Sequence, residues 1–442
     1  ALKNPNSKYR NYYFFRKGSK DTPPNNWSSF FGGSAWRYFE ETGEWVLHLF
    51  SDKQMDLNWE CKELREDMIG MLRWWLEQGI DGFRFDAINY ISKQREFPDG
   101  NLTIAEVIGY CGIEHYFYGP RLHDYLREIR EKALDPYQAF SIGEMPGIGT
   151  QMQKLLTGED RGELDMMFSF DHLETPGHKR YHTYQYDLEF YKEYLADTIS
   201  QLGNQCHMAL YYNNHDNPRF LSKVGAPAQY RSELAKMLAV IQFTSRGTPF
   251  IFQGDEFGAA NHHFDSIDQI KDIESHNFYR YWTKQVGMTK EKAFSMVQFG
   301  TRDQGRTPMQ WTSEQNGGFT TGTPWIESDG DYTVWNVEDQ LHDEHSVLSF
   351  YKMLIQLRKK EKAFAYGETV FIKKHVKRLF LYERMYQGKK FFIECNLSDG
   401  IKERFYRVDS YTLLLSSYET TAAKLRPFEA NIYMESLDAK SV

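Results

Sequence analysis

An arginine and an aspartate stand two residues apart in a short apolar run, Gly82-Phe83-Arg84-Phe85-Asp86-Ala87-Ile88-Asn89. Side chains two apart on a β-strand share a face, so Arg84 and Asp86 point to the same side. Burying such charges is costly unless they pair and face a cavity. Taken alone, the run is equally consistent with a structural ion pair in a core and with a site that does chemistry.

Two later apolar runs also end in polar residues. Glu144 lies near the end of the run that begins at Phe140, two residues before Pro146. His215 and Asp216 stand in the polar cluster Asn213-Asn214-His215-Asp216-Asn217-Pro218-Arg219. Acids at the C-terminal ends of successive strands are typical of the active site of a (β/α)₈ barrel. A pair of carboxyl groups, one ionised and one protonated, can break a glycosidic bond with retention of configuration.

These segments carry a specific resemblance. GFRFDAIN, GEMPG and NNHDNPR resemble three signature regions of the α-amylase superfamily (glycoside hydrolase family 13), and they occur in the family's order. Three motifs in order are far more specific than any one of them. The segment RDQGRTPMQW at 302–311 resembles the RDNARTPMQW phrase of oligosaccharide α-glucosidases, with Gln-Gly in place of Asn-Ala.

The resemblance implies a role for each acid. Asp86 would be the nucleophile, Glu144 the general acid, and Asp216 the third acid, which grips sugar hydroxyls. The charge of Arg84 beside Asp86 favours an ionised carboxylate, as a nucleophile requires. An apolar setting at a strand tip would favour the protonated form of Glu144.

The predicted substrate-binding residues have simpler alternatives. Arg302 matches a family arginine that holds the non-reducing end of the substrate, but many loop arginines only pair at the surface. Phe168 could wall the sugar site or pack in the core, and a histidine at position 215 could simply be a satisfied polar residue. The predicted substrate-binding set is Arg84, Phe168, His215, Arg219 and Arg302. No metal ligand is predicted.

Composition narrows the class of protein. The 442 residues, 41% of them apolar, suit two or three domains, and a net charge of −8 argues against a nucleic-acid surface. The cysteines lie far apart without a CxxC pair, which predicts free thiols in a reducing compartment. They are Cys61, Cys111, Cys206 and Cys395. With no leader or membrane-length apolar run, we expect a cytoplasmic monomer that acts on a small oligosaccharide, without nucleic-acid or membrane partners.

The predicted architecture is α/β: a TIM (β/α)₈-type barrel whose N-terminal strands are absent from this chain, with a small inserted domain and a C-terminal antiparallel β domain. Residues 1–58 would be the remainder of the insert, residues 59–366 barrel strands four to eight, and residues 367–442 a β-sandwich-like domain. Apolar periodicity and helix-stop signals predict helices at 62–78, 121–133, 187–202 and 346–360.

A complete barrel needs eight strand–helix units, about 250 residues or more. The resemblance would place three strands, roughly 100 residues by that arithmetic, before Ala1. In the family that segment contains a calcium loop, so a structural calcium there stays open, while no cofactor is predicted for this chain. Because an open barrel has unpaired edges, we expect a truncated product whose activity on its own is doubtful.

Three functional hypotheses follow. The first is a retaining α-glucosidase that removes terminal glucose from short oligosaccharides. Ala87 after the nucleophile favours α-1,4 or mixed α-1,4/α-1,6 links, because family members selective for α-1,6 links commonly carry Val there. The second is a trehalose-6-phosphate hydrolase, which shares the motifs. The third is an inactive or non-catalytic relative, such as a transporter-associated subunit, which the presence of all three acids disfavours.

Overall fold

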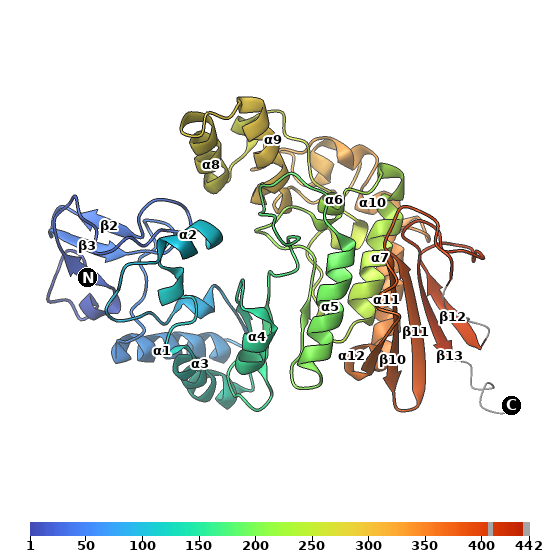
Figure 1. Ribbon diagram of the computed structural model, residues 1–442, viewed down its shortest axis with the longest axis horizontal. Coiled ribbons are helices and arrows are strands. Elements are labelled where there is room, and N and C mark those ends of the chain that lie inside the picture. Colours follow the sequence, from blue (N-terminus) through green and yellow to red (C-terminus); the bar gives the residue numbers. More distant parts are fainter. Residues whose placement is uncertain (405–409, 436–442) are drawn as a thin grey trace. The chain divides into compact units, whose positions relative to one another are not determined.

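The computed structural model (Figure 1) describes residues 1–404 and 410–435. By its internal contacts the chain forms two compact units. The first comprises Ala1–Asp171 with Asn204–Cys206, and the second comprises His172–Gly203 with His207–Val442. The division between them falls inside the predicted domain 59–366, and the three-domain division of the chain remains a prediction.

Unit 1 begins with a small antiparallel sheet of the order β1-β3-β2. Its strands are β1 (Phe15–Lys17), β2 (Trp36–Phe39) and β3 (Glu44–Leu47). Aromatic side chains build the core around it: Trp27 is 1% exposed, and its indole N–H donates to the carbonyl oxygen of Pro98 at 2.8 Å. The aromatic richness of this region is therefore largely ordinary core packing.

The second sheet of unit 1 is parallel, with the order β4-β5-β6. Its strands are β4 (Gly82–Phe85), β5 (Phe140–Glu144) and β6 (Met166–Phe168). Parallel strands need crossover connections, and helices supply them here. The helices of unit 1 are α1 (Lys62–Glu77), α2 (Leu102–Ile108), α3 (Leu122–Ile129), which continues into a π-helical turn at Arg130–Leu134, and α4 (Gly149–Thr157).

Helix α1 confirms the helix predicted at 62–78. Leu64, Ile69, Leu72 and Leu76 are buried at helical spacing, and the last three share a core cluster with side chains of α3 and its continuation. Gly79, which follows the helix, has a φ of +96° that suits glycine. Helix α1 thus supports β4, whose C-terminal end carries the predicted nucleophile.

Unit 2 contains a short parallel pair, β7 (Ala209–Leu210) and β8 (Thr248–Pro249). Residues 249–256 were predicted as the last strand, but only Pro249 at the start of this run belongs to β8. Further along, Gly254 has a φ of +99°, and the Asp255 carboxylate accepts from the backbone N–H of Phe252 at 3.0 Å. This local hydrogen bond closes a turn and ends the strand early.

Unit 2 is otherwise mainly helical up to the C-terminal domain. Its helices are α5 (Leu188–Leu202), α6 (Phe220–Val224), α7 (Arg231–Thr244), α8 (Ile273–Lys284), α9 (Lys290–Gly300), α10 (Val337–Leu341), α11 (Val347–Lys360) and α12 (Ala363–Tyr366). Helices α5 and α11 confirm the predictions at 187–202 and 346–360. Every residue of α7 from Leu234 to Thr244 is buried, because the helix packs against both α11 and the C-terminal sheet.

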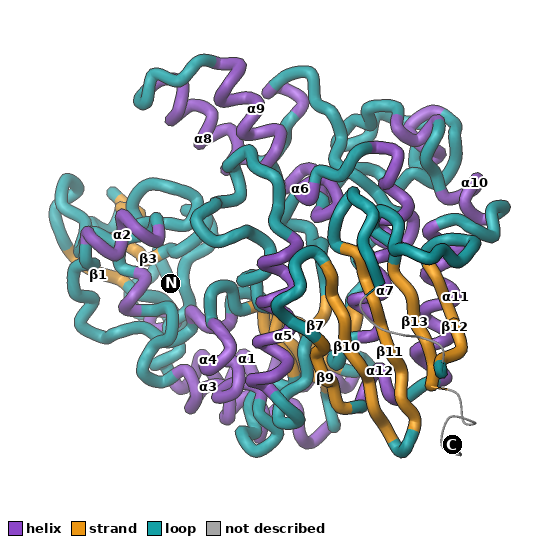
Figure 2. The backbone as a smooth tube through the Cα atoms, turned by 45° about the vertical axis from the view of Figure 1, so that its right-hand side comes forward, coloured by secondary structure: helices purple, strands orange, loops and turns teal. Residues whose placement is uncertain are grey.

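The C-terminal domain is a five-stranded antiparallel sheet, visible in Figure 2, with the order β12-β13-β11-β10-β9. Its strands are β9 (Glu368–Ile372), β10 (Leu379–Tyr386), β11 (Lys389–Asn396), β12 (Tyr411–Ser416) and β13 (Ala430–Glu435). The sheet confirms the predicted antiparallel β domain. The four cysteines are free, as predicted. Within the described ranges, no helix has the length and apolarity that crossing a membrane would require.

Candidate active site

Two of the three predicted acids belong to unit 1, and the first of them follows the end of β4. The strand stops at Phe85, and Asp86 and Ala87 turn the chain into a short 3₁₀ turn, Ile88–Tyr90. Ala87 has φ +44° and ψ +36°, a left-handed conformation that costs a non-glycine residue about 1–2 kcal/mol. Strain of this kind clusters at functional sites, where the surrounding structure holds it in place.

One guanidinium connects two of the predicted acids. Arg84 pairs with the Asp86 carboxylate, and its Nη2 lies 2.8 Å from Oε1 of Glu144. The parallel register that aligns Phe85 with Gly143 brings the C-terminal ends of β4 and β5 to the same edge. The expected Arg84–Asp86 contact is therefore confirmed, and Glu144 joins it from the neighbouring strand.

The two carboxylates differ in environment. The Asp86 side chain is 76% exposed, whereas that of Glu144 is 11% exposed. Oε2 of Glu144 also lies 3.4 Å from the backbone nitrogen of Ala87. The expected burial of Glu144 is present, but its surroundings are not purely apolar, because the Arg84 guanidinium contacts it. Phe168, at the end of β6, is the register partner of Glu144 and is half-buried.

The third predicted acid belongs to unit 2, in the loop after β7. Oδ1 of Asp216 accepts from Arg302 and from Arg306, both at 2.9 Å, while Oδ2 lies 3.3 Å from Nε2 of His215. The backbone N–H of Asp216 donates to the side-chain oxygen of Asn214 at 2.9 Å. The carboxylate is thus held through one oxygen by two arginines of the RDQGRTPMQW segment.

Arg302 is the centre of a larger charge network. Its Nη2 lies 2.6 Å from Glu274, and its Nε lies 3.3 Å from Asp272. Burial and the positive charge of Arg180 act to lower the pKa of Arg302, but Glu274, Asp216 and Asp272 outweigh them and raise it. Arg180 also pairs with Glu274, and it donates to the backbone carbonyl of Asp216 at 3.1 Å.

Four members of this network were not predicted from the sequence: Arg180, Asp272, Glu274 and Arg306. Arg306 stands inside a recognised motif and could have been included. Asp272 shows a helix N-cap pattern, and its carboxylate accepts from the backbone N–H groups of Glu274 and Ser275. Nothing local in the sequence indicates Arg180, which lies 94 residues from its partner Glu274.

Arg219 and His215 occupy different surroundings. The Arg219 side chain is buried, donates to the carbonyl oxygen of Gln253 at 2.7 Å, and lies over the ring of Phe252. Burial lowers its pKa. The His215 side chain is 55% exposed beside Asp216. The contacts of Arg219 support the chain around Gln253, and its part in substrate binding remains a prediction, as does that of His215.

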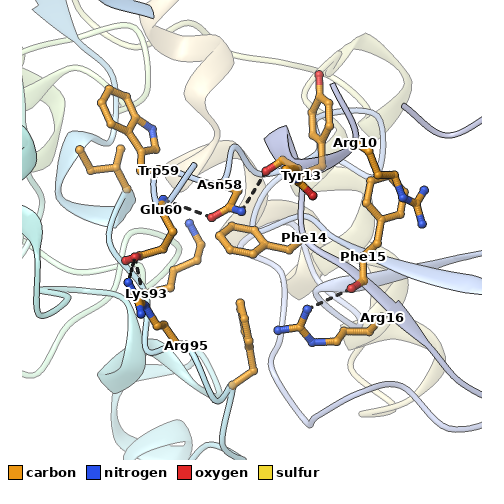
Figure 3. A pocket seen from close by; sticks show the side chains of 13 residues that line it. Arg10, Tyr13, Phe14, Phe15, Arg16, Asn58, Trp59, Glu60, Lys93 and Arg95 are labelled. Carbon is orange, nitrogen blue, oxygen red and sulfur yellow. Dashed lines mark hydrogen bonds and ion pairs between the residues drawn. The ribbon is translucent and has the colours of Figure 1, made fainter. Parts of the chain in front are cut away.

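A cavity of about 320 Å³ lies elsewhere in unit 1, between the N-terminal sheet and the start of α1 (Figure 3). Neither Asp86 nor Glu144 lines it. Most of its cations are paired with acids: Arg10 with Glu44, Lys93 with Asp56, and Arg95 with Glu60. The described residues contain no cluster of three His, Cys, Asp or Glu side chains arranged to hold a metal ion.

The chain is similar in sequence to proteins of known family. Residues 1–367 match the family model of the alpha amylase catalytic domain. The chain is 40% identical to an oligo-1,6-glucosidase of Halalkalibacterium halodurans, over 98% of this chain and 79% of the relative. It is 37% identical to a trehalose-6-phosphate hydrolase of Bacillus subtilis, over 98% of this chain and 78% of the relative.

Two solved structures share the fold. A trehalose-6-phosphate hydrolase of Bacillus licheniformis, crystallised as an R201Q mutant, superimposes with a TM-score of 0.90 at 32% identity. An isomaltulose synthase from Klebsiella sp. LX3 superimposes with a TM-score of 0.91, also at 32% identity. Each comparison covers 98% of this chain and 79% of the other. The predicted barrel-type α/β fold with its C-terminal β domain is confirmed.

Proposed function

The chain belongs to the α-amylase family of glycoside hydrolases (family 13), and from this premise we infer that it is a retaining α-glucosidase acting on short oligosaccharides. One observation carries the inference. Arg84 contacts both Asp86 and Glu144 where two neighbouring parallel strands end. A retaining glycosidase needs two carboxyl groups about 5–5.5 Å apart.

We assign the chemistry in two steps. In the first, protonated Glu144 gives its proton to the glycosidic oxygen while the Asp86 carboxylate attacks the anomeric carbon, so that a glycosyl ester forms and the aglycone leaves. In the second, ionised Glu144 takes a proton from a water molecule that attacks the same carbon and releases Asp86. No redox cofactor takes part in either step, and the absence of a cofactor remains a prediction.

The contacts of Glu144 set one condition on these two reaction steps. Glu144 must carry a proton before it can act as an acid, yet in the structure it contacts the Arg84 guanidinium. Substrate binding must therefore weaken the Arg84–Glu144 contact while Arg84 keeps Asp86 ionised. The large exposed fraction of Asp86, 76%, suits a nucleophile that a substrate can reach.

Asp216 would hold the sugar. Its Oδ1 is occupied by Arg302 and Arg306, so Oδ2, beside His215, is the oxygen that we assign to sugar hydroxyls. A carboxylate fixed in advance loses little conformational entropy when it binds, which is the advantage of the paired arginines. We also assign Phe168 and Arg302 to substrate binding.

Two observations favour different glycosidic linkages for the substrate. Relatives named oligo-1,6-glucosidase support cleavage of α-1,6 links, and an alpha-glucosidase of Pediococcus pentosaceus is 36% identical. The small side chain of Ala87 leaves room for an α-1,4 aglycone. We therefore propose mixed α-1,4 and α-1,6 specificity, with a monomeric, cytoplasmic enzyme as the accompanying expectation.

Trehalose-6-phosphate hydrolysis is the second candidate, favoured by the relatives and the solved structure that bear this name. The test is to measure kcat/KM on maltose, isomaltose and trehalose 6-phosphate, with Asp86→Asn as the inactive control. Proton NMR of the first product follows its anomeric configuration. Hydrolysis of maltose and isomaltose with the α-anomer formed first is the expected result. Hydrolysis of trehalose 6-phosphate alone favours the second candidate, and no hydrolysis of any of the three favours the third hypothesis, an inactive or non-catalytic relative.

A further inference from the structure

Glu274 stands in the first turn of α8 and is 8% exposed. Its Oε2 accepts from Nη2 of Arg302 at 2.6 Å and from Nη2 of Arg180. Its backbone is fixed as well, because the Asp272 carboxylate caps the helix and accepts from the N–H of Glu274 at 3.3 Å. A single buried carboxylate oxygen therefore holds two guanidinium groups in place.

Both of those arginines reach Asp216, from two directions. Arg302 donates to the Asp216 carboxylate at 2.9 Å, and Arg180 donates to the Asp216 backbone carbonyl at 3.1 Å. Among the described contacts, Glu274 meets Asp216 through these arginines and not directly. The side chain and the main chain of Asp216 are thus tied to one anchor.

The charges of the cluster are balanced. Three arginines (Arg180, Arg302 and Arg306) face three acids (Asp216, Asp272 and Glu274). Removing the charge of Glu274 would leave the arginines in excess and take from Arg180 the acid with which it pairs. A partly buried charge that loses its partner is strongly unfavourable, so we expect the arginines to rearrange.

We propose that Glu274 is a positioning residue for the third acid of the active site: it orients Arg302 and Arg180, and through them it fixes Asp216. The proposal rests on the function proposed for Asp216. Glu274 need not touch the sugar for this role, since its effect passes through the arginines. A displacement of Asp216 of about 1 Å is enough to lower turnover by about a hundredfold.

The experiment compares wild type with Glu274→Gln, Arg302→Lys and the double variant, using kcat and KM for p-nitrophenyl α-glucoside. Glu361→Gln is the matched control, because Glu361 is also buried and ion-paired, with Lys389 at 2.7 Å, but it supports the C-terminal sheet. We expect Glu274→Gln to lower kcat by about tenfold to a hundredfold while KM changes by less than about threefold. Because both changes act on Asp216, the double variant should lose little more than the worse single variant.

An unchanged kcat in Glu274→Gln, or losses that multiply in the double variant, would overturn the proposal. If Glu274→Gln does not fold, Glu274→Asp replaces it, since it keeps the charge but shortens the reach to the two arginines. A wild-type protein without hydrolytic activity would refute the proposed function only. Crystal structures of wild type and Glu274→Gln then decide the positioning: loss of the Arg302–Asp216 contact supports it, and an unmoved Asp216 overturns it.

Discussion

At the scale of single residues, the shared guanidinium is the most informative feature. Arg84 spans two carboxylates that come from neighbouring strands, with Nη1 on Asp86 and Nη2 on Glu144, so that each nitrogen of its planar fork contacts one acid. A lysine carries the same charge, but concentrates it on one ammonium nitrogen. The identity of residue 84, and not only its charge, is therefore part of the site.

Replacing Arg84 by lysine tests this. We expect Arg84→Lys to lower kcat by about a hundredfold, because a single ammonium nitrogen does not reproduce the fixed spacing with which the guanidinium holds the two carboxylates in register. The melting temperature should fall by no more than a few degrees. Arg127→Lys, a substitution on the exposed side of α3 where Arg127 pairs with Asp124, is the control and should leave kcat unchanged. Equal activity of Arg84→Lys and wild type would show that the fork is not needed.

Ala87 offers a test of linkage. Valine at this position fills space beside the cleaved bond, and one or two methyl groups in a pocket are worth about 1–3 kcal/mol of discrimination. We expect Ala87→Val to lower the ratio of kcat/KM on maltose to that on isomaltose by about tenfold or more. The left-handed φ of +44° makes a β-branched residue unfavourable here, so stability should fall as well. Both substrates are measured on the same protein sample, so the ratio does not depend on the loss of stability. A constant or rising ratio would contradict the role of residue 87 in linkage specificity.

At the scale of elements, one glycine lets two loops approach each other. Gly305 replaces the alanine of the RDNARTPMQW phrase. A Cβ there would lie 2.7 Å from the carbonyl oxygen of Asn214 and 2.9 Å from that of Asn217. Both contacts are backbone, so neither can yield without moving the loop that carries Asp216. The close approach is what places Arg302 and Arg306 on the Asp216 carboxylate.

We therefore expect Gly305→Ala to push the two loops apart. It should raise KM for maltose by about threefold to tenfold and lower the melting temperature, because the overpacking costs about 1–3 kcal/mol. Gly322→Ala is the control, since a Cβ at Gly322 would lie 3.6 Å from its nearest neighbour, an ordinary contact. Gly305→Ala with wild-type KM and stability would show that the loops are not held at this distance.

The elements themselves were largely predictable. Helices such as α1 and α11 follow from apolar spacing and terminal signals, and β4 and β5 follow from apolar runs bounded by glycine or proline. The end of β8 was not predictable, because a side-chain hydrogen bond of Asp255 determines where the strand stops. The three acids followed from motifs, whereas Arg180 and Glu274 join the network through contacts far apart in sequence, which no local pattern encodes.

At the scale of the whole molecule, burial of one histidine links stability to pH. His172 in unit 2 is 5% exposed, and its Nε2–H donates to the carbonyl oxygen of Tyr211 at 2.8 Å. Burial lowers the pKa of His172 to about 4. In the unfolded chain a histidine has a pKa of about 6.5. Its contribution to stability is therefore complete above about pH 6.5 and is lost as the pH falls towards 4.

Replacing His172 by glutamine, which can still donate to Tyr211, removes this dependence. Between pH 7 and pH 5 the wild-type chain should lose about 2 kcal/mol of stability through His172 alone, and the variant should not. The measurement is the free energy of unfolding in urea at both pH values, compared between the two proteins. Because carboxylates titrate equally in both, the difference isolates His172. Equal losses in the two proteins would contradict the buried, neutral state of this histidine.

The proposed mechanism requires Asp86 to be the nucleophile of a retaining glycosidase. The most direct measurement is to trap the glycosyl ester with 5-fluoro-α-D-glucosyl fluoride, whose ester hydrolyses slowly, and to identify the labelled peptide by mass spectrometry. We expect one label per chain, on Asp86 in the peptide that contains Gly82–Asn89, and no label in Asp86→Asn. A label on another residue, or turnover of the reagent without a covalent adduct, would contradict it.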